Sequence, residues 1–231
     1  MIAPPGSPRP GDGFPAVKIC GLRRRQDAEH AALAGADFLG VVLVPGTPRA
    51  LSAEEARDVV AGLAPPVVTV IADLPLHRAQ KEAEIVGAAV IQLHGEEPPG
   101  YALDLKGLGA WKLWKAIRVK EVNDVLRGLE AYVDVVDGLL LDGWHPRQTG
   151  GSGTSFSWEE VGKIRGRFPE GVRLIAAGGL RPENVGEAVR RLRPHVVDVS
   201  SGVEAVPGIK SPEKVQAFIR NVRGTGKGER I

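Results

Sequence analysis

Two side chains that can transfer protons follow apolar runs far apart in the chain. Cys20 closes the run Ala16–Cys20, and Asp142 closes the run Val136–Asp142. A thiolate can act as a general base or nucleophile, and a carboxyl group whose pKa is raised can act as a general acid. Each also has a structural interpretation, because a lone cysteine is often a small buried hydrophobe and an aspartate can end a strand. If both face one site, one can accept a proton while the other donates one.

Clusters of glycine and serine form a candidate phosphate site. Gly178-Gly179 precedes a helical pattern that starts near Arg181, and Ser200-Ser201-Gly202 follows another apolar run. Glycines let backbone N–H groups approach an anion, and a helix N-terminus adds a favourable partial charge. The two clusters together favour phosphate binding over tight turns alone. The predicted phosphate-binding residues are Gly178, Gly179, Ser200, Ser201 and Gly202.

Three more polar residues are candidate substrate ligands: Arg49, Gln92 and His94. The Arg49 guanidinium could bind a carboxylate through two hydrogen bonds, or it could be solvated. His94 could contact a substrate, or it could be satisfied within a wall of the protein. No metal site is expected, because the five histidines lack ligand spacing and the chain has one cysteine.

Short apolar runs separate these candidates and predict the strands that position them. They are rich in Val, Ile and Leu, which is typical of strands buried on both faces. The eight runs are Ala16–Cys20, Phe38–Val44, Val67–Ala72, Ala89–His94, Lys112–Ile117, Val136–Asp142, Val172–Gly178 and Val196–Ser200.

Helical patterns lie between the runs. Ser52 and Glu55 form a capping box, and Ser211-Pro212 predicts the start of the last helix. Pro182 is expected at an early position of another helix. Weaker patterns cover Gln26–Ala34, Leu76–Val86, Pro98–Leu108, Val122–Tyr132 and Trp158–Arg167.

The alternation of eight strands with about eight helices predicts an α/β fold, a single-domain (β/α)8 TIM barrel. A doubly wound open sheet is the alternative, but no glycine-rich dinucleotide fingerprint follows the first strand. Barrel enzymes place their chemistry at the carboxyl ends of the strands, where the candidate residues fall.

The amino-acid composition indicates which kind of ligand and which cellular location to expect. The 231 residues include 30 Lys and Arg against 28 Asp and Glu, a balance that favours a small anionic ligand over nucleic acid. The sequence has no apolar run of membrane-spanning length and no signal peptide, and it has a single cysteine, so a cytoplasmic protein is expected. We expect a disordered Pro/Gly-rich leader at 1–15, the barrel domain at 16–223 and a flexible tail at 224–231.

Taken together, the motifs resemble the phosphoribosylanthranilate isomerase family of tryptophan biosynthesis. The resemblance runs from about Val17 to Arg223. The matching motifs are Lys18–Leu22, Pro45–Arg49, Gln92–Gly95, Leu141-Asp142, Gly150–Gly153 with Phe156–Trp158, Ala177–Val185, Asp198–Glu204 and Pro207–Lys214.

The resemblance implies an Amadori rearrangement of N-(5-phosphoribosyl)anthranilate. Asp142 would be the general acid that opens the ribose ring, and Cys20 the general base that removes the proton at C2. Arg49 would hold the anthranilate carboxylate, and the glycine and serine clusters the phosphate. No cofactor is implied, because the Schiff-base nitrogen serves as the electron sink.

Some expectations stay open at this point. The glycine-rich stretch 150–158 is interpreted as a lid over the substrate, or as a tight chain reversal. The chain could be a monomer or a homodimer. The alternatives in function are a sister phosphosugar barrel enzyme and a barrel that binds a phosphosugar without converting it.

Overall fold

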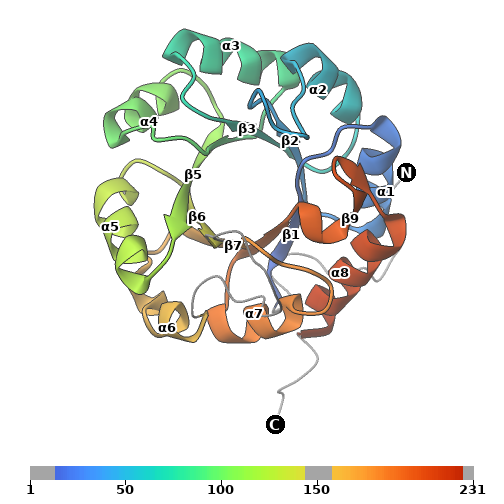
Figure 1. Ribbon diagram of the computed structural model, residues 1–231. Coiled ribbons are helices and arrows are strands. Elements are labelled where there is room, and N and C mark those ends of the chain that lie inside the picture. The colour runs from blue at the N-terminus through green and yellow to red at the C-terminus, as the bar shows by residue number, and fades with distance from the viewer. Residues whose placement is uncertain (1–13, 144–157, 226–231) are drawn as a thin grey trace.

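Eight parallel strands close into a barrel that helices surround (Figure 1). This computed structural model describes residues 14–143 and 158–225. β8 (Val196–Val199) pairs with β1 (Ala16–Ile19) over Ala16↔Val196 to Ile19↔Val199, so the barrel is closed and the open-sheet alternative is wrong. All eight predicted strands are present: β1 Ala16–Ile19, β2 Phe38–Val42, β3 Val67–Ile71, β4 Val90–Leu93, β5 Lys112–Val119, β6 Gly138–Gly143, β7 Arg173–Ala177 and β8 Val196–Val199.

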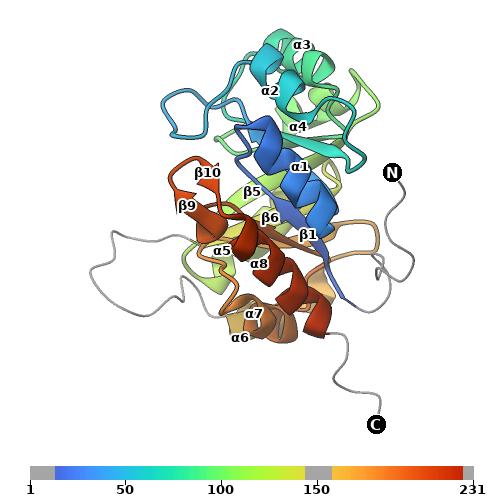
Figure 2. The same cartoon turned by 90° about the vertical axis from the view of Figure 1, so that its right-hand side faces the viewer.

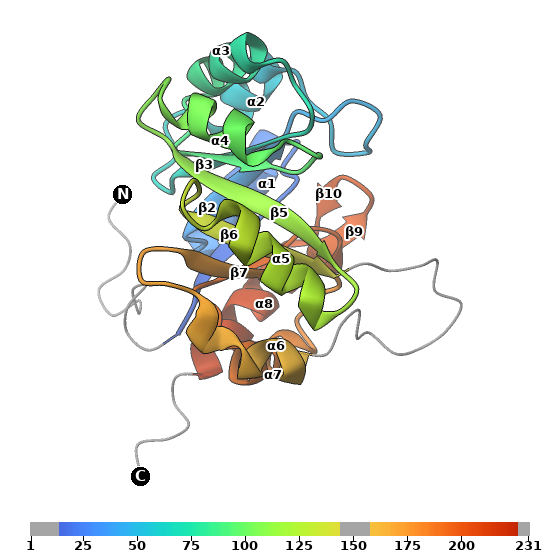
Figure 3. The ribbon, with the colours of Figure 1, turned by 90° about the vertical axis from the view of Figure 1, so that its left-hand side faces the viewer.

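The helices pack on the outside of the barrel. Figure 2 shows α1 (Arg25–Ala34) beside α8 (Pro212–Gly224), and Figure 3 shows α5 (Val122–Tyr132) over β5 and β6. Two predicted caps are confirmed: Ser52 and Glu55 form the capping box, and the Ser211 hydroxyl accepts from the Lys214 N–H. The helices are α1 Arg25–Ala34, α2 Ala53–Val60, α3 Leu76–Val86, α4 Pro99–Lys106, α5 Val122–Tyr132, α6 Trp158–Lys163, α7 Val185–Leu192 and α8 Pro212–Gly224.

The start of α7 differs from the prediction. We expected Pro182 inside the first turn, but the helix begins at Val185. The Asn184 side chain accepts a hydrogen bond from the Arg181 N–H at 2.8 Å and donates one to the Gly179 carbonyl at 3.0 Å. These two side-chain hydrogen bonds stabilise a turn over residues 181–184 ahead of the helix.

A hairpin that the sequence analysis missed follows β8. It consists of β9 Glu204–Val206 and β10 Ile209–Lys210, which pair antiparallel (Figure 2). Pro207-Gly208 joins the two strands, and Gly208 has φ +82°. A Pro-Gly pair is typical of a turn that needs positive φ at its second residue, so this signal was present in the sequence.

The alternation of side chains along the strands decides what faces the interior. Val17 and Ile19 pack outward in the layer between strands and helices, whereas Ala16 packs inside the barrel with residues such as Trp114 and Leu140. Successive strand residues point to opposite faces, so Lys18 and Cys20 point inward with Ala16. The inner face of β1 therefore carries the predicted base.

Parts of the prediction lie outside the described residues. They are most of the predicted leader and tail and almost all of the glycine-rich stretch at 150–158. Among residues 14–143 and 158–225, no helix has the length and apolar character needed to cross a membrane.

Candidate active site

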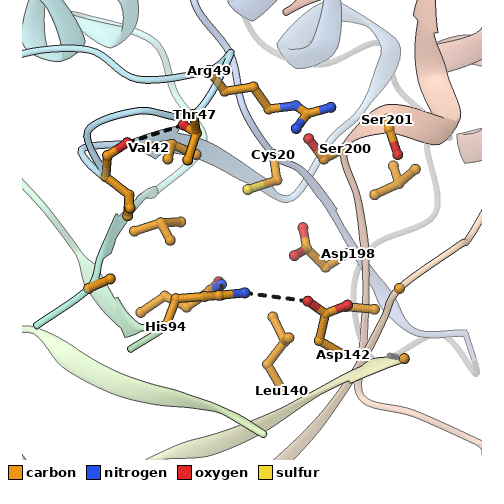
Figure 4. Close-up of a pocket in the computed structure, with 18 of the residues that line it drawn as sticks. Cys20, Val42, Thr47, Arg49, His94, Leu140, Asp142, Asp198, Ser200 and Ser201 are labelled. Atoms are coloured by element: carbon orange, nitrogen blue, oxygen red, sulfur yellow. Dashed lines mark hydrogen bonds and ion pairs between the residues drawn. The ribbon is translucent and has the colours of Figure 1, made fainter. Parts of the chain in front are cut away.

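A cavity of about 550 Å³ opens at the carboxyl ends of the strands (Figure 4). The structure brings every predicted site residue to its wall. These residues are Cys20, Arg49, Gln92, His94, Asp142, Gly178, Gly179, Ser200, Ser201 and Gly202. They come from both halves of the chain, and the closed barrel places them around one space.

Cys20 follows β1 and projects into this cavity. A Cβ atom at Gly40, on the neighbouring β2, would lie 3.0 Å from both the Cys20 Sγ and the Lys18 Cε. Glycine at this position therefore leaves room for both side chains. Burial raises the pKa of the Cys20 thiol, and the charge of Lys18 opposes this rise.

Lys18 lies fully buried beneath Cys20. Its Nζ donates to the Gln92 Oε1 at 2.8 Å and to the Asp198 Oδ2 at 3.1 Å. Burial disfavours the ammonium form, but the charges and hydrogen bonds of Asp198 and Cys20 together outweigh it, and the pKa of Lys18 is raised. A charged lysine therefore sits at the floor of the cavity. The sequence did contain a signal for this residue, because Lys18 lies inside an apolar run that predicts a strand buried on both faces.

Asp198, on β8, is a further residue of the site to which the sequence analysis gave no role. It lies between Cys20 and Asp142 (Figure 4). Lys18 engages one carboxylate oxygen, whereas Oδ1 is buried and makes no hydrogen bond within the described part of the chain. Burial raises the pKa of Asp198, with Lys18 opposing the rise. A buried oxygen without a partner is costly, so a ligand contact is the natural use of this position.

A chain of polar contacts fixes the orientation of His94. The Gln92 Oε1 accepts from Lys18, which can only donate, so the Gln92 amide nitrogen donates to the His94 Nδ1 at 2.9 Å. The His94 Nε2 then carries the hydrogen that faces the Asp142 Oδ2 at 3.4 Å (Figure 4). The lysine, glutamine, histidine and aspartate thus span the cavity from floor to rim.

Arg49 already holds a carboxylate of the chain itself. Its Nε and Nη2 donate to the two oxygens of Glu204 at 2.8 and 2.7 Å. The alternative of a solvated arginine is therefore wrong. The expected bidentate geometry is present, but the partner is a residue from the missed hairpin.

The loops after β7 and β8 pack tightly against each other. Gly178 and Gly179 have φ +79° and +66°, in the left-handed region that glycine adopts without strain. A Cβ on Gly178 would overlap the Gly143 backbone nitrogen and lie 2.7 Å from the Asp142 Oδ1. A Cβ on Gly202 would overlap the Leu180 carbonyl. Gly178 is therefore needed for close packing next to the predicted acid, and Gly202 for close packing of the two loops.

Metal ligands do not gather in the described part of the chain. No group of three or more His, Cys, Asp or Glu side chains there is arranged to hold a metal ion. Two ion pairs lie at the cavity instead, Lys18 with Asp198 and Arg49 with Glu204.

The fold and the site define the class: a (β/α)8-barrel enzyme with glycine- and serine-lined loops after its last two strands. Residues 17–221 match the family model described as N-(5'phosphoribosyl)anthranilate (PRA) isomerase. The chain therefore belongs to the N-(5'-phosphoribosyl)anthranilate isomerase family.

Individual relatives agree with this membership. The N-(5'-phosphoribosyl)anthranilate isomerase of Moorella thermoacetica is 44% identical over 209 residues, covering 90% of this chain and 89% of the relative. The enzyme of the same name from Myxococcus xanthus is 43% identical over 209 residues, covering 88% of this chain and 94% of the relative. The crystal structure of phosphoribosyl anthranilate isomerase from Thermotoga maritima has a TM-score of 0.83 at 35% identity, covering 91% of this chain and 100% of that chain.

Proposed function

We propose that the chain converts N-(5'-phosphoribosyl)anthranilate to 1-(2-carboxyphenylamino)-1-deoxyribulose 5-phosphate by an Amadori rearrangement, in tryptophan biosynthesis. The observation that carries the proposal is one cavity between Cys20 and Asp142, in a chain of this family. A related structure, 33% identical with a TM-score of 0.80, holds reduced 1-(o-carboxyphenylamino)-1-deoxyribulose 5-phosphate.

Asp142 starts the reaction as general acid. Its proton passes to the ribose ring oxygen while the bond from C1 to that oxygen breaks. The nitrogen lone pair then forms the C1=N bond of a Schiff base. The Asp142 side chain is 34% exposed, so water can return the proton between turnovers.

Cys20 completes the reaction as general base. It takes the proton from C2, the C–H electrons form a C1=C2 bond, and the C1=N electrons return to nitrogen. The resulting enolamine loses its C2 hydroxyl proton and gains a proton at C1, which gives the ketone. Lys18 lies beneath Cys20 and stabilises the thiolate that must form.

The remaining residues hold the two ends of the substrate. Backbone N–H groups around Gly178-Gly179 and Ser200–Gly202 bind the phosphate. Arg49 binds the anthranilate carboxylate. Gln92 and His94 line the same cavity, and His94 faces Asp142. The substrate is thereby aligned along the line from Cys20 to Asp142.

The barrel domain at 16–223 acts on its own in this proposal, without cofactor, nucleic acid or membrane. We expect the protein to be either a monomer or a homodimer. We also expect it to be located in the cytoplasm. Among the relatives, a Thermotoga maritima structure 35% identical to this chain is of monomers generated from a dimeric enzyme.

The first experiment follows the fluorescence of phosphoribosylanthranilate after addition of the purified protein. We expect the wild type to consume it, and Cys20→Ser and Asp142→Asn each to lower kcat by about 10²- to 10⁴-fold, because each removes a proton-transfer group. Asp58→Asn, on the exposed face of α2, is the matched control and should leave kcat unchanged.

Two results would contradict the proposal. A wild type that binds the compound but leaves its fluorescence intact would be a phosphosugar-binding barrel. Unchanged turnover in both variants would place the chemistry on other groups.

A further inference from the structure

An ionic network joins the two predicted anion-binding parts of the site. Glu204 accepts from the Arg49 Nε and Nη2 at 2.8 and 2.7 Å, and from the Lys210 Nζ at 2.9 Å. The same Lys210 Nζ donates to the Ser200 carbonyl at 3.1 Å, in the loop predicted to bind phosphate. Glu204 therefore connects the carboxylate-binding arginine with the phosphate loop.

The hairpin that carries Glu204 is anchored on two sides. The backbone N–H of Lys210 donates to Asp27 on α1, and the Lys214 Nζ on α8 donates to the Glu204 carbonyl. Lys210 and Glu204 also face each other across β9 and β10. Both side chains are buried, so the Glu204 carboxylate has little freedom to move.

The Arg49 side chain is held along its length. It passes over Gly21, where a Cβ would overlap the Arg49 Cδ and lie 2.9 Å from the Ser200 Oγ. Glu204 takes the edge of the guanidinium formed by Nε and Nη2. The opposite edge, with Nη1, makes no hydrogen bond to the described residues, and Arg49 lines the cavity. That edge can bind a second carboxylate side by side with the first.

The charges of the network favour an incoming anion. Within the network, Arg49 and Lys210 are two cations against the single anion Glu204; burial lowers the pKa of Lys210, and its ion pair with Glu204 opposes this. Burial opposes ionisation of Glu204, but hydrogen bonds from Arg49 and Lys210 lower its pKa to about 2. The carboxylate stays ionised at any pH near neutrality, so the anchor of Arg49 is permanent.

We infer that Glu204 is a positioning residue that makes the site select a substrate bearing an aryl carboxylate, because it fixes the Arg49 guanidinium with its free edge toward the cavity. The inference rests on the proposed function, which supplies the carboxylated substrate. Without Glu204, Arg49 keeps its charge but loses the fixed plane that a bidentate contact requires.

Binding by calorimetry tests the inference without relying on turnover. The ligands are reduced 1-(2-carboxyphenylamino)-1-deoxyribulose 5-phosphate and the same compound without the carboxylate. We expect the wild type to prefer the carboxylated ligand by about 10- to 100-fold, the range for hydrogen bonds to a charged group. In Glu204→Gln the preference should fall below about fivefold. Glu29→Gln, which loses a surface ion pair with Arg25 on α1, should keep it.

Further variants separate positioning from folding. Affinity for the carboxylate-free ligand reports an intact phosphate site, so each variant contains its own folding control. Glu204→Asp keeps the charge but is too short for the full geometry, and it should show an intermediate preference. In an Arg49→Met background, Glu204→Gln should change the preference no further, because Glu204 acts through Arg49.

Two outcomes distinguish the inference from the proposed function. If Glu204→Gln keeps the wild-type preference, or weakens both ligands equally, the positioning role is wrong while the proposed function stands. If the wild type binds neither ligand, the proposed substrate is wrong and the inference fails with it.

Discussion

Asp198 is the residue whose contacts indicate a ligand-binding role most directly. Lys18 engages its Oδ2, while its buried Oδ1 has no partner among the described residues. We expect Asp198→Asn to lower kcat/KM by about 10- to 100-fold, because the site loses a charged acceptor next to Cys20. We also expect it to lower the free energy of unfolding by about 3–5 kcal/mol, because Lys18 is left as a buried charge with Gln92 alone. Steady-state kinetics and urea unfolding measure the two effects.

A double variant separates these two roles of Asp198. Lys18→Met with Asp198→Leu removes both charges, so stability should return towards the wild-type value. Turnover should stay low, because the variant lacks both the Asp198 acceptor and the Lys18 charge that stabilises the Cys20 thiolate. Full activity in this double variant would mean that the carboxylate serves the fold alone.

At the residue scale, the sequence predicted the groups at strand ends and Gln92 within β4, but gave no role to Lys18 within β1 or Asp198 within β8. Cys20 and Asp142 were found because each closes an apolar run. Lys18 and Asp198 lie within buried runs, and only the closed barrel shows that they meet across β1 and β8. Glu204 was missed as the partner of Arg49 for the same reason, since no local pattern links positions so far apart in the chain.

At the scale of elements, the end of β7 places the predicted acid and the predicted phosphate loop in contact. Gly178 has φ +79°, and a Cβ there would overlap the Gly143 nitrogen and crowd the Asp142 Oδ1. We expect Gly178→Ala to cost about 1–3 kcal/mol of unfolding free energy and to reduce kcat at least tenfold, because the loop must shift beside Asp142. Thermal unfolding and steady-state kinetics check both parts.

The control is a glycine where a methyl group fits. At Gly186, in α7, the nearest atom to an added Cβ is 3.5 Å away. Gly186→Ala should keep full activity and stabilise the protein by up to about 1 kcal/mol. If Gly178→Ala and Gly186→Ala have the same kcat and the same free energy of unfolding, the end of β7 tolerates a side chain.

Local sequence patterns predicted the presence of the strands and helices better than they predicted where each one begins and ends. Apolar runs predicted the eight strands, and caps such as Ser52 predicted where helices begin. The start of α7 was wrong because Asn184 satisfies backbone groups of the preceding turn. The hairpin of β9 and β10 was missed because its strands are too short to show alternation, although Pro207-Gly208 marked the turn.

At the scale of the whole molecule, the site exists only when the barrel is closed. Cys20 comes from the first strand and Asp198 from the last, and Glu204 follows that last strand to reach Arg49 after β2. The charged groups that serve the site therefore also tie the two ends of the barrel together. The stability of the fold and the electrostatics of the site should change with pH in step.

Acid unfolding tests this link. The pKa of Glu204 is about 2 in the folded chain against an ordinary value of 4.5, so its stabilisation is complete above pH 4.5 and is lost as the pH falls towards 2. Glu204→Gln cannot titrate and serves as the reference. The difference in unfolding free energy between wild type and variant should shrink by about 1–2 kcal/mol between pH 6 and pH 3, with allowance for screening by solvent. Urea unfolding at pH 6, 4 and 3 measures this difference. A difference that stays constant to pH 3 would mean that Arg49 and Lys210 do not hold Glu204 ionised, and that the network does not tie the hairpin to the barrel.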